Sequence, residues 1–123
     1  MMHQKALCFK DRKSAALIMK ADDERYIKEL GRRIQPFDEL TWNGVRQIIV
    51  YNGLIQKFTQ NPDLKKFLLD TGDAVLAECA VNDRIWGIGL SLHADDRFYP
   101  AKWNGQNLLG YVLMMARDSL RCI

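Results

Sequence analysis

Apolar positions recur at three- and four-residue steps through most of this chain, which is the spacing of amphipathic helices. The first ten residues place Met2, Ala6 and Phe9 on one face and predict that the sequence begins within a helix. Residues 14–20 predict a short buried helix, and the carboxylates that follow suit the first turn of a third helix ending near Gly31. The amino-terminal quarter is therefore predicted to consist of three short helices.

The strongest helical period comes after Pro36 and Asp38, which mark the start of a long central helix. Its inward stripe is predicted to comprise Val45, Ile48, Ile49, Ile55 and Phe58. Asn61 and Pro62 then have the residue types of an N-cap and a first helical position. They predict a short helix that ends near Gly72 and turns three apolar residues inward, Leu64, Phe67 and Leu68.

The remainder of the chain combines a loop region with one more helix. Residues 74–80 fit a brief strand, whereas residues 82–105 are rich in glycine and aromatic residues and predict a structured loop. From about Gly105 to Leu120 one helical face carries Leu109, Val112, Leu113, Ala116 and Leu120. The expected fold is mainly α, a compact multi-helix domain with little or no β structure.

Composition narrows the class of protein. The 123 residues are 48% hydrophobic, enough for a single domain over residues 1–123. The formal net charge of +3 does not by itself indicate nucleic-acid binding, and no apolar run predicts a signal peptide or a membrane span. Three widely spaced cysteines without a C-x-x-C pair favour reduced thiols over disulfides or zinc. We therefore expect a soluble cytoplasmic protein with no bound metal and no cofactor.

Two stretches carry residue types that packing alone does not require. Residues 76–89 place two carboxylates and a tryptophan ahead of two glycines. Residues 103–114 combine a glycine-containing loop with an asparagine at a predicted helix start. Free backbone N–H groups at such a start can receive phosphate. The two stretches together favour a nucleotide-like ligand.

These stretches resemble the paired signatures of the NADAR (YbiA-like) family of N-glycosidases, V-L-x-E-x-x-x-x-D-x-x-W-G-x-G at residues 75–89 and G-x-N-x-L-G-x-x-L-M at residues 105–114. The resemblance extends back through residues 69–72, Trp42 and Gly31-Arg32 to the opening residues 3–6. It implies hydrolysis of the N-glycosidic bond of a phosphorylated ribosyl substrate. That substrate would be a riboflavin-pathway intermediate or ADP-ribose attached to guanine in nucleic acid.

The resemblance also implies a set of site residues. The catalytic positions are Lys5, whose amine would attack the anomeric carbon, and the two carboxylates Glu78 and Asp83. The substrate-binding positions are Trp86, Gly87, Gly89, Arg32 and Asn107. Judged without the family, Lys5 is an ordinary solvated lysine, the two acids are surface or capping carboxylates, and Trp86 is a core residue.

Family members that this chain resembles begin some tens of residues earlier, with a segment that contains a further catalytic glutamate. We therefore expect an N-terminally truncated form of the domain. An apolar face left uncovered by that segment predicts self-association as a homo-oligomer. An alternative interpretation is a catalytically impaired module that binds ADP-ribose or a related nucleotide, and a third is a purely structural helical domain.

Overall fold

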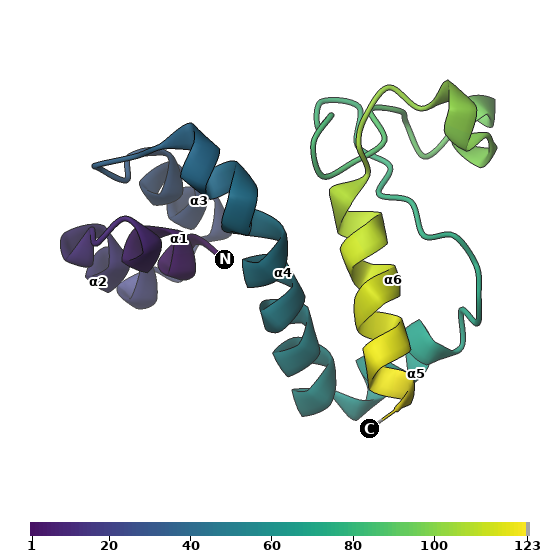
Figure 1. Ribbon diagram of the computed structural model, residues 1–123, viewed down its shortest axis with the longest axis horizontal. Coiled ribbons are helices and arrows are strands. Elements are labelled where there is room, and N and C mark those ends of the chain that lie inside the picture. Colours follow the sequence, from purple (N-terminus) through teal and green to yellow (C-terminus); the bar gives the residue numbers. More distant parts are fainter. Residues whose placement is uncertain (123) are drawn as a thin grey trace. The chain divides into compact units, whose positions relative to one another are not determined.

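The computed structural model describes residues 1–122, and the last residue of the predicted domain lies outside them. The described residues contain six α-helices, two short 3-10 turns and no strand, which confirms the predicted mainly α fold (Figure 1). The helices are α1 (Met2–Cys8), α2 (Arg12–Lys20), α3 (Glu24–Arg32), α4 (Glu39–Gln60), α5 (Pro62–Leu69) and α6 (Leu108–Arg121). The 3-10 turns are η1 (Asp95–Phe98) and η2 (Pro100–Lys102). The chain divides into two compact units, Met1–Ile49 and the residues from Val50 onward.

In the first unit, α1, α2 and α3 pack around one apolar core, with Trp42 of α4 against it. The buried residues of this core are Ala6, Phe9, Ala15, Ile18, Leu30 and Ile34. Aspartates cap two of these helices: the Asp11 carboxylate accepts from the Ser14 N–H at 3.0 Å at the start of α2, and the Asp23 carboxylate caps α3, where the sequence predicts carboxylates. The hydrogen bonds that Asp11 accepts from Ser14 and Gln35 lower the pKa of its carboxyl group.

The prediction that residues 14–20 form a buried helix is wrong in its extent. Ala15 and Ile18 of α2 are buried, whereas Leu17 and Met19 are 39% and 69% exposed. A nine-residue helix that packs against α1 and α3 covers only the face turned toward them. The run of five apolar residues therefore identifies a helix without saying that all of its sides are covered.

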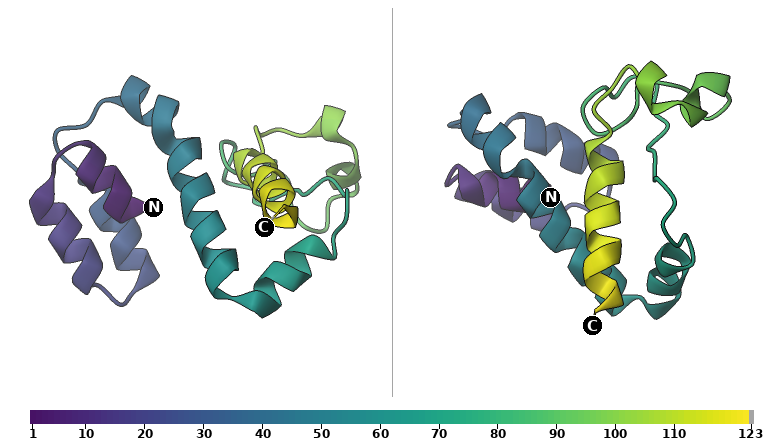
Figure 2. Two further views of the ribbon diagram at one scale, coloured as in Figure 1. Left: turned by 60° about the horizontal axis from the view of Figure 1, so that its bottom comes forward. Right: turned by 45° about the vertical axis from the view of Figure 1, so that its right-hand side comes forward.

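The second unit has its core where α4, α5 and α6 contribute Phe58, Leu68 and Leu120. Figure 2 shows α5 beside the carboxyl-terminal end of α6. Several residues of the predicted inward stripes are exposed, namely Ile48 of α4 and Leu64 and Phe67 of α5, at 60%, 43% and 77%. Asn61 occupies the predicted N-cap position, but its side-chain amide donates to the Lys57 carbonyl at 2.6 Å instead of accepting from α5.

Residues 74–80 do not form the predicted strand. A strand requires a neighbouring backbone for its ladder, and no segment among residues 1–122 supplies one here. An asparagine side chain from the start of α6 takes two of the hydrogen bonds that a neighbouring strand would make, to the Leu76 carbonyl and the Glu78 N–H. In Figure 1 the segment leaves α5 as an uncoiled trace and continues into the loops at the amino-terminal end of α6.

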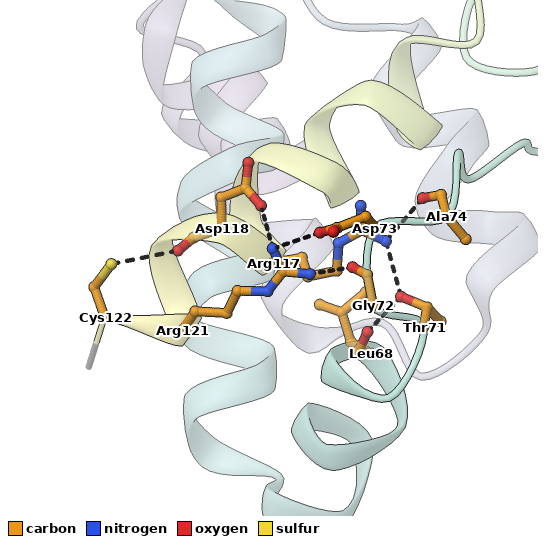
Figure 3. Close-up of polar contacts among 9 residues, drawn as sticks. All are labelled: Leu68, Thr71, Gly72, Asp73, Ala74, Arg117, Asp118, Arg121 and Cys122. Carbon is orange, nitrogen blue, oxygen red and sulfur yellow. Dashed lines mark hydrogen bonds and ion pairs between the residues drawn. The ribbon is translucent and has the colours of Figure 1, made fainter.

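Two arginines of α6 fix the turn that precedes this segment (Figure 3). The Arg117 guanidinium, only 4% exposed, donates to the Thr71 hydroxyl and to the Ala74 carbonyl, each at 2.9 Å. The Arg121 guanidinium donates to the Gly72 carbonyl and forms an ion pair with Asp73 at 3.1 Å. The entry to residues 75–89 is therefore anchored to the carboxyl-terminal half of α6.

Candidate functional site

Lys5 lies in a partly buried, aromatic environment in the first unit. Its Nζ donates to the Gly31 carbonyl of α3 at 2.9 Å. The same nitrogen lies 4.8 Å from the ring centroid of Phe37 and 5.3 Å from that of Trp42. Desolvation by burial lowers the pKa of Lys5 below its usual value. A larger fraction of its amine is therefore neutral near pH 7 than for a solvated lysine.

The approach of α1 to α3 depends on the absence of a side chain at Gly31. A Cβ at this position would overlap the thioether and Cγ of Met2. With no side chain at Gly31, its carbonyl oxygen lies within hydrogen-bond distance of the Lys5 amine on α1. Arg32, the predicted substrate-binding residue beside it, is the last residue of α3 and is exposed.

The other predicted site residues lie in the second unit, and a buried asparagine organises them. Asn107 has no exposed surface and adopts the left-handed backbone conformation with φ of 53°. Its side-chain Nδ2 donates to the Leu76 carbonyl at 2.8 Å, and its Oδ1 accepts from the Glu78 N–H at 2.9 Å. The backbone N–H of Asn107 donates to the Gly87 carbonyl at 3.0 Å. One residue thus joins both ends of the 76–89 segment to the start of α6.

The backbone N–H groups at the start of α6 are occupied by the same segment. Gln106, Leu108 and Leu109 donate to the carbonyls of Arg84, Ile85 and Trp86 at 2.8, 3.1 and 3.0 Å. These groups were predicted to be free for phosphate, and in this structure they bind the loop instead. Contact between Asn107 and phosphate stays a prediction, and the full burial of the side chain leaves it no exposed donor.

The two carboxylates of the motif lie on one loop but in different surroundings. Glu78 is exposed, and only its backbone is fixed, by Asn107 on one side and by the Ile88 N–H at 2.9 Å on the other. Asp83 is half-buried, and its Oδ1 accepts from the N–H groups of Ile85 and Trp86 at 3.1 and 2.8 Å. Asp83 therefore shapes the turn that carries the half-buried Trp86.

The glycines of the motif permit close approach of the chain to itself. A Cβ at Gly87 would lie 2.9 Å from the Asp83 carbonyl oxygen and 3.0 Å from that of Glu78. Gly89 has a φ of +71°, and a Cβ there would lie 3.1 Å from the backbone of Asn104. Most of the close neighbours of both glycines are backbone atoms of residues 78–104, with the Cβ atoms of Ala80 and Asn104 beside them.

A third glycine offers a direct test of this packing. A Cβ at Gly105 would overlap the Gly87 carbonyl oxygen and crowd the backbone of Ile88. We expect Gly105→Ala to lower the free energy of unfolding by about 2–4 kcal/mol, because backbone atoms must move apart. Gly53→Ala is the control, since no atom lies within 4 Å of its added Cβ in the middle of α4. That control should raise stability by about 0.5–1 kcal/mol, and chemical denaturation measures both.

Sequence reasoning gave no role to two residues that surround the candidate nucleophile. Phe37 follows Pro36 in the connection before α4, and no short-range pattern links it to Lys5. The resemblance to the family includes Trp42 but implies no role for it. The contact of Phe37 with Phe9 of α1, at 5.1 Å between centroids, shows why Phe37 lies there. The recognisable signal was an aromatic pair flanking a predicted helix start.

Residues 1–122 contain neither a cluster of metal ligands nor a helix able to span a membrane. No three His, Cys, Asp or Glu side chains of residues 1–122 gather in a way that could hold a metal ion. None of the described helices has both the length and the apolar character needed to cross a bilayer.

Comparison with known proteins identifies the family. Residues 1–121 match the description "NADAR domain". An N-glycosidase of Acanthamoeba polyphaga mimivirus is 43% identical over 118 residues, which cover 96% of this chain and 69% of the relative. The N-glycosidase YbiA of Escherichia coli is 31% identical over 113 residues, covering 91% of this chain and 63% of the relative. A riboflavin biosynthesis protein of Vibrio vulnificus is 31% identical over 113 residues, 92% of this chain and 28% of the relative. The chain belongs to the NADAR family.

Proposed function

We propose that this protein is an N-glycosidase that hydrolyses the bond between a base and a phosphorylated ribose. Of the three relatives described above, two are named N-glycosidase and one is named a riboflavin biosynthesis protein. The chain spans less than two thirds of the length of YbiA. We propose as substrates a riboflavin-pathway intermediate or ADP-ribosylated guanine in nucleic acid, and as location the cytoplasm, where three free thiols stay reduced.

The environment of Lys5 carries this proposal. An amine attacks a carbon only in its neutral form, and desolvation lowers the pKa of Lys5. The hydrogen bond to Gly31 leaves the flexible side chain with one fixed direction, while the rings of Phe37 and Trp42 limit access of water. An exposed lysine would have neither property.

The reaction we propose is a displacement followed by hydrolysis. The Lys5 amine forms a bond to the anomeric carbon, and the C–N bond to the base breaks with its electron pair going to the base, which takes up a proton from an acid. Opening of the ribose ring then gives a protonated imine with Lys5. Addition of one water molecule to that imine releases ribose phosphate and regenerates the amine.

The motif residues take the remaining roles in this proposal. Glu78, exposed and without a hydrogen bond that fixes its carboxylate among residues 1–122, is the group we assign as proton donor to the base. Asp83 is assigned as the second catalytic carboxylate, and it also holds the turn of Trp86. Trp86 would stack on the base. Arg32 would bind the phosphate through its guanidinium.

Gly87, Gly89 and Asn107 belong to the substrate-binding part of the proposal. They form the frame that sets the backbone position of Glu78 and Trp86. We assign to this frame the task of holding the two side chains at the surface where substrate arrives.

The activity is tested by incubating the protein with the riboflavin-pathway intermediate and, separately, with DNA that carries ADP-ribosylated guanine. Release of free base together with ribose phosphate from one of them is the expected result, measured by chromatography. No release from either substrate by protein of verified fold would contradict the glycosidase proposal.

One observation favours a second candidate, a module that binds a nucleotide without cleaving it. Asp83 uses one carboxylate oxygen to shape the turn, and Glu78 is exposed, so neither acid lies in the kind of apolar pocket that holds a typical proton donor. Calorimetric titration with ADP-ribose distinguishes the two. Binding without release of product supports the module, and turnover supports the enzyme.

A further inference from the structure

Residues 75–79 have the side-chain alternation of an extended strand. Leu76 packs against the buried cluster of Phe58, Leu68 and Leu120. Val75 and Cys79 line a different region, an apolar cavity of about 370 Å³ that Leu92, Phe98 and Trp103 also border. Ala77, between them, borders both this cavity and the one beside Phe58 and Leu68. Because alternate residues face opposite ways, alternate backbone groups must also point to opposite edges of the segment.

One edge of this segment is already paired. Asn107 spans the Leu76 carbonyl and the Glu78 N–H with its side-chain amide, as the N–H and C=O of one residue in a parallel neighbouring strand would. The Glu78 carbonyl accepts from the Ile88 N–H on the same edge. The even-numbered residues are therefore satisfied by the protein itself.

The opposite edge is open. The N–H and C=O groups of Val75, Ala77 and Cys79 point to this edge, and none of them forms a hydrogen bond with any of residues 1–122. Val75 is 61% exposed and Ala77 is exposed as well. Protein structures usually protect such an edge with a lysine, a proline, a bulge or a covering segment. Neither lysine nor proline occurs at positions 75–79.

We propose that this open edge pairs with the same edge of a second copy of the chain, antiparallel, about a two-fold axis through Ala77. Ala77 of one copy then lies opposite Ala77 of the other, and Val75 lies opposite Cys79. Each of the three residues donates once and accepts once, giving about six hydrogen bonds across the axis. The edge is thus complementary to itself, which is the requirement for an interface between identical surfaces.

The side chains around the edge fit a second copy of this chain. Ala77 and Cys79 are small and uncharged, so another backbone can approach to strand distance. Leu92 and Phe98, which border the same cavity, are 63% and 69% exposed. Pairing would place two such apolar surfaces on one face of the ribbon and remove part of both from water.

The oligomeric state tests the proposal. Sedimentation of the full chain should show a dimer that dissociates on dilution. Val75→Lys introduces a charge at the edge of both copies and should weaken the dimer at least tenfold. Met115→Lys is the control, because Met115 is equally exposed, at 59%, but lies on α6. Circular dichroism should show both variants folded, since both positions are at the surface.

A disulfide tests the register. In a variant with Cys8→Ser and Cys122→Ser, the change Val75→Cys should allow oxidative cross-linking to Cys79 of the second copy. Hydrogen-bonded antiparallel pairs have Cα atoms about 5.5 Å apart, within the range that a disulfide spans. Residues 75 and 79 of one extended segment are roughly 13 Å apart, so they do not bridge within a copy. Met115→Cys in the same background should give no such cross-link.

Two results would overturn the proposal. One is a wild-type chain that sediments as a monomer at every concentration. The other is a dimer that Val75→Lys leaves as stable as wild type and that forms no cross-link between positions 75 and 79. Neither result bears on glycosidase activity, because the groups that pair belong to Val75, Ala77 and Cys79 and not to Glu78, the proposed catalytic residue between them.

Discussion

Lys5→Ala is expected to lower turnover of the ribosyl substrate by about a thousandfold or more, because the proposed covalent step loses its nucleophile. The same change should abolish the adduct that borohydride forms with the wild-type protein during turnover, since borohydride reduces the imine to a stable amine. Mass spectrometry of the intact chain measures the adduct. Its peptide map should place the added mass on Lys5.

Two controls accompany that experiment. Lys20→Ala removes an exposed lysine at the end of α2 and should leave both turnover and adduct unchanged. Lys5→Arg keeps a cation beside Phe37 and Trp42 but cannot form an imine, so it should be folded and inactive. A wild-type protein that turns over substrate without any trapped adduct would exclude the covalent route while leaving hydrolysis by water open.

The pH dependence of turnover follows from the direction of the Lys5 pKa shift. Burial lowers that pKa, and the amine is active only after it loses its proton. The rate constant kcat/KM should therefore rise with pH and level off below the ordinary lysine pKa of about 10.4. Stability changes in the same direction: the unfolded chain binds this proton more tightly, so the free energy of unfolding rises with pH between the folded and the unfolded pKa. A midpoint at or above the ordinary value would contradict a desolvated nucleophile.

Helices and their starts could be predicted from the sequence because both depend on neighbouring residues. Asp11, Asp23 and Asp38 each accept a backbone N–H at the start of a helix, an interaction that spans two or three residues. The helical repeat likewise depends on spacing alone. How much of each face is covered depends on distant segments, and the exposure of Phe67 at 77% was therefore not predictable from its position in the repeat.

In the candidate site, too, features set by neighbouring residues could be predicted and features set by distant segments could not. Residues 76–89 were identified because unusual residue types occur close together in the chain. The contact of Lys5 with Gly31 and Phe37 joins residues 26 or more positions apart, and no local pattern encodes it. Asn107 stands at a predicted helix start, where asparagine ordinarily caps. Its left-handed backbone turns the side chain toward residues 76 and 78 instead, some thirty positions earlier.

Asn107→Ala is expected to lower the free energy of unfolding by about 3–7 kcal/mol. The change leaves the Leu76 carbonyl and the Glu78 N–H without partners, at about 1–3 kcal/mol each. It also places alanine at a φ of 53°, which costs about 1 kcal/mol more. Asn107→Gly relieves the backbone strain but does not restore the two hydrogen bonds. It should therefore be more stable than Asn107→Ala by only about 1 kcal/mol. Urea denaturation of the three proteins separates the two contributions.

Asn107→Asp distinguishes a structural asparagine from one that contacts phosphate. Only a protonated aspartic acid can both donate to the Leu76 carbonyl and accept from the Glu78 N–H, and the full burial of this position raises the pKa of a carboxyl group placed there. The protonated aspartic acid should contribute its full stabilisation below the pKa of about 3.9 that the group has in the unfolded chain. That stabilisation should be lost as pH rises through the higher pKa that the group has in the folded protein. A phosphate contact predicts a different outcome, in which stability matches wild type at pH 7 while substrate affinity falls through charge repulsion. Measuring unfolding and KM on the same variant assigns Asn107 to one role or the other.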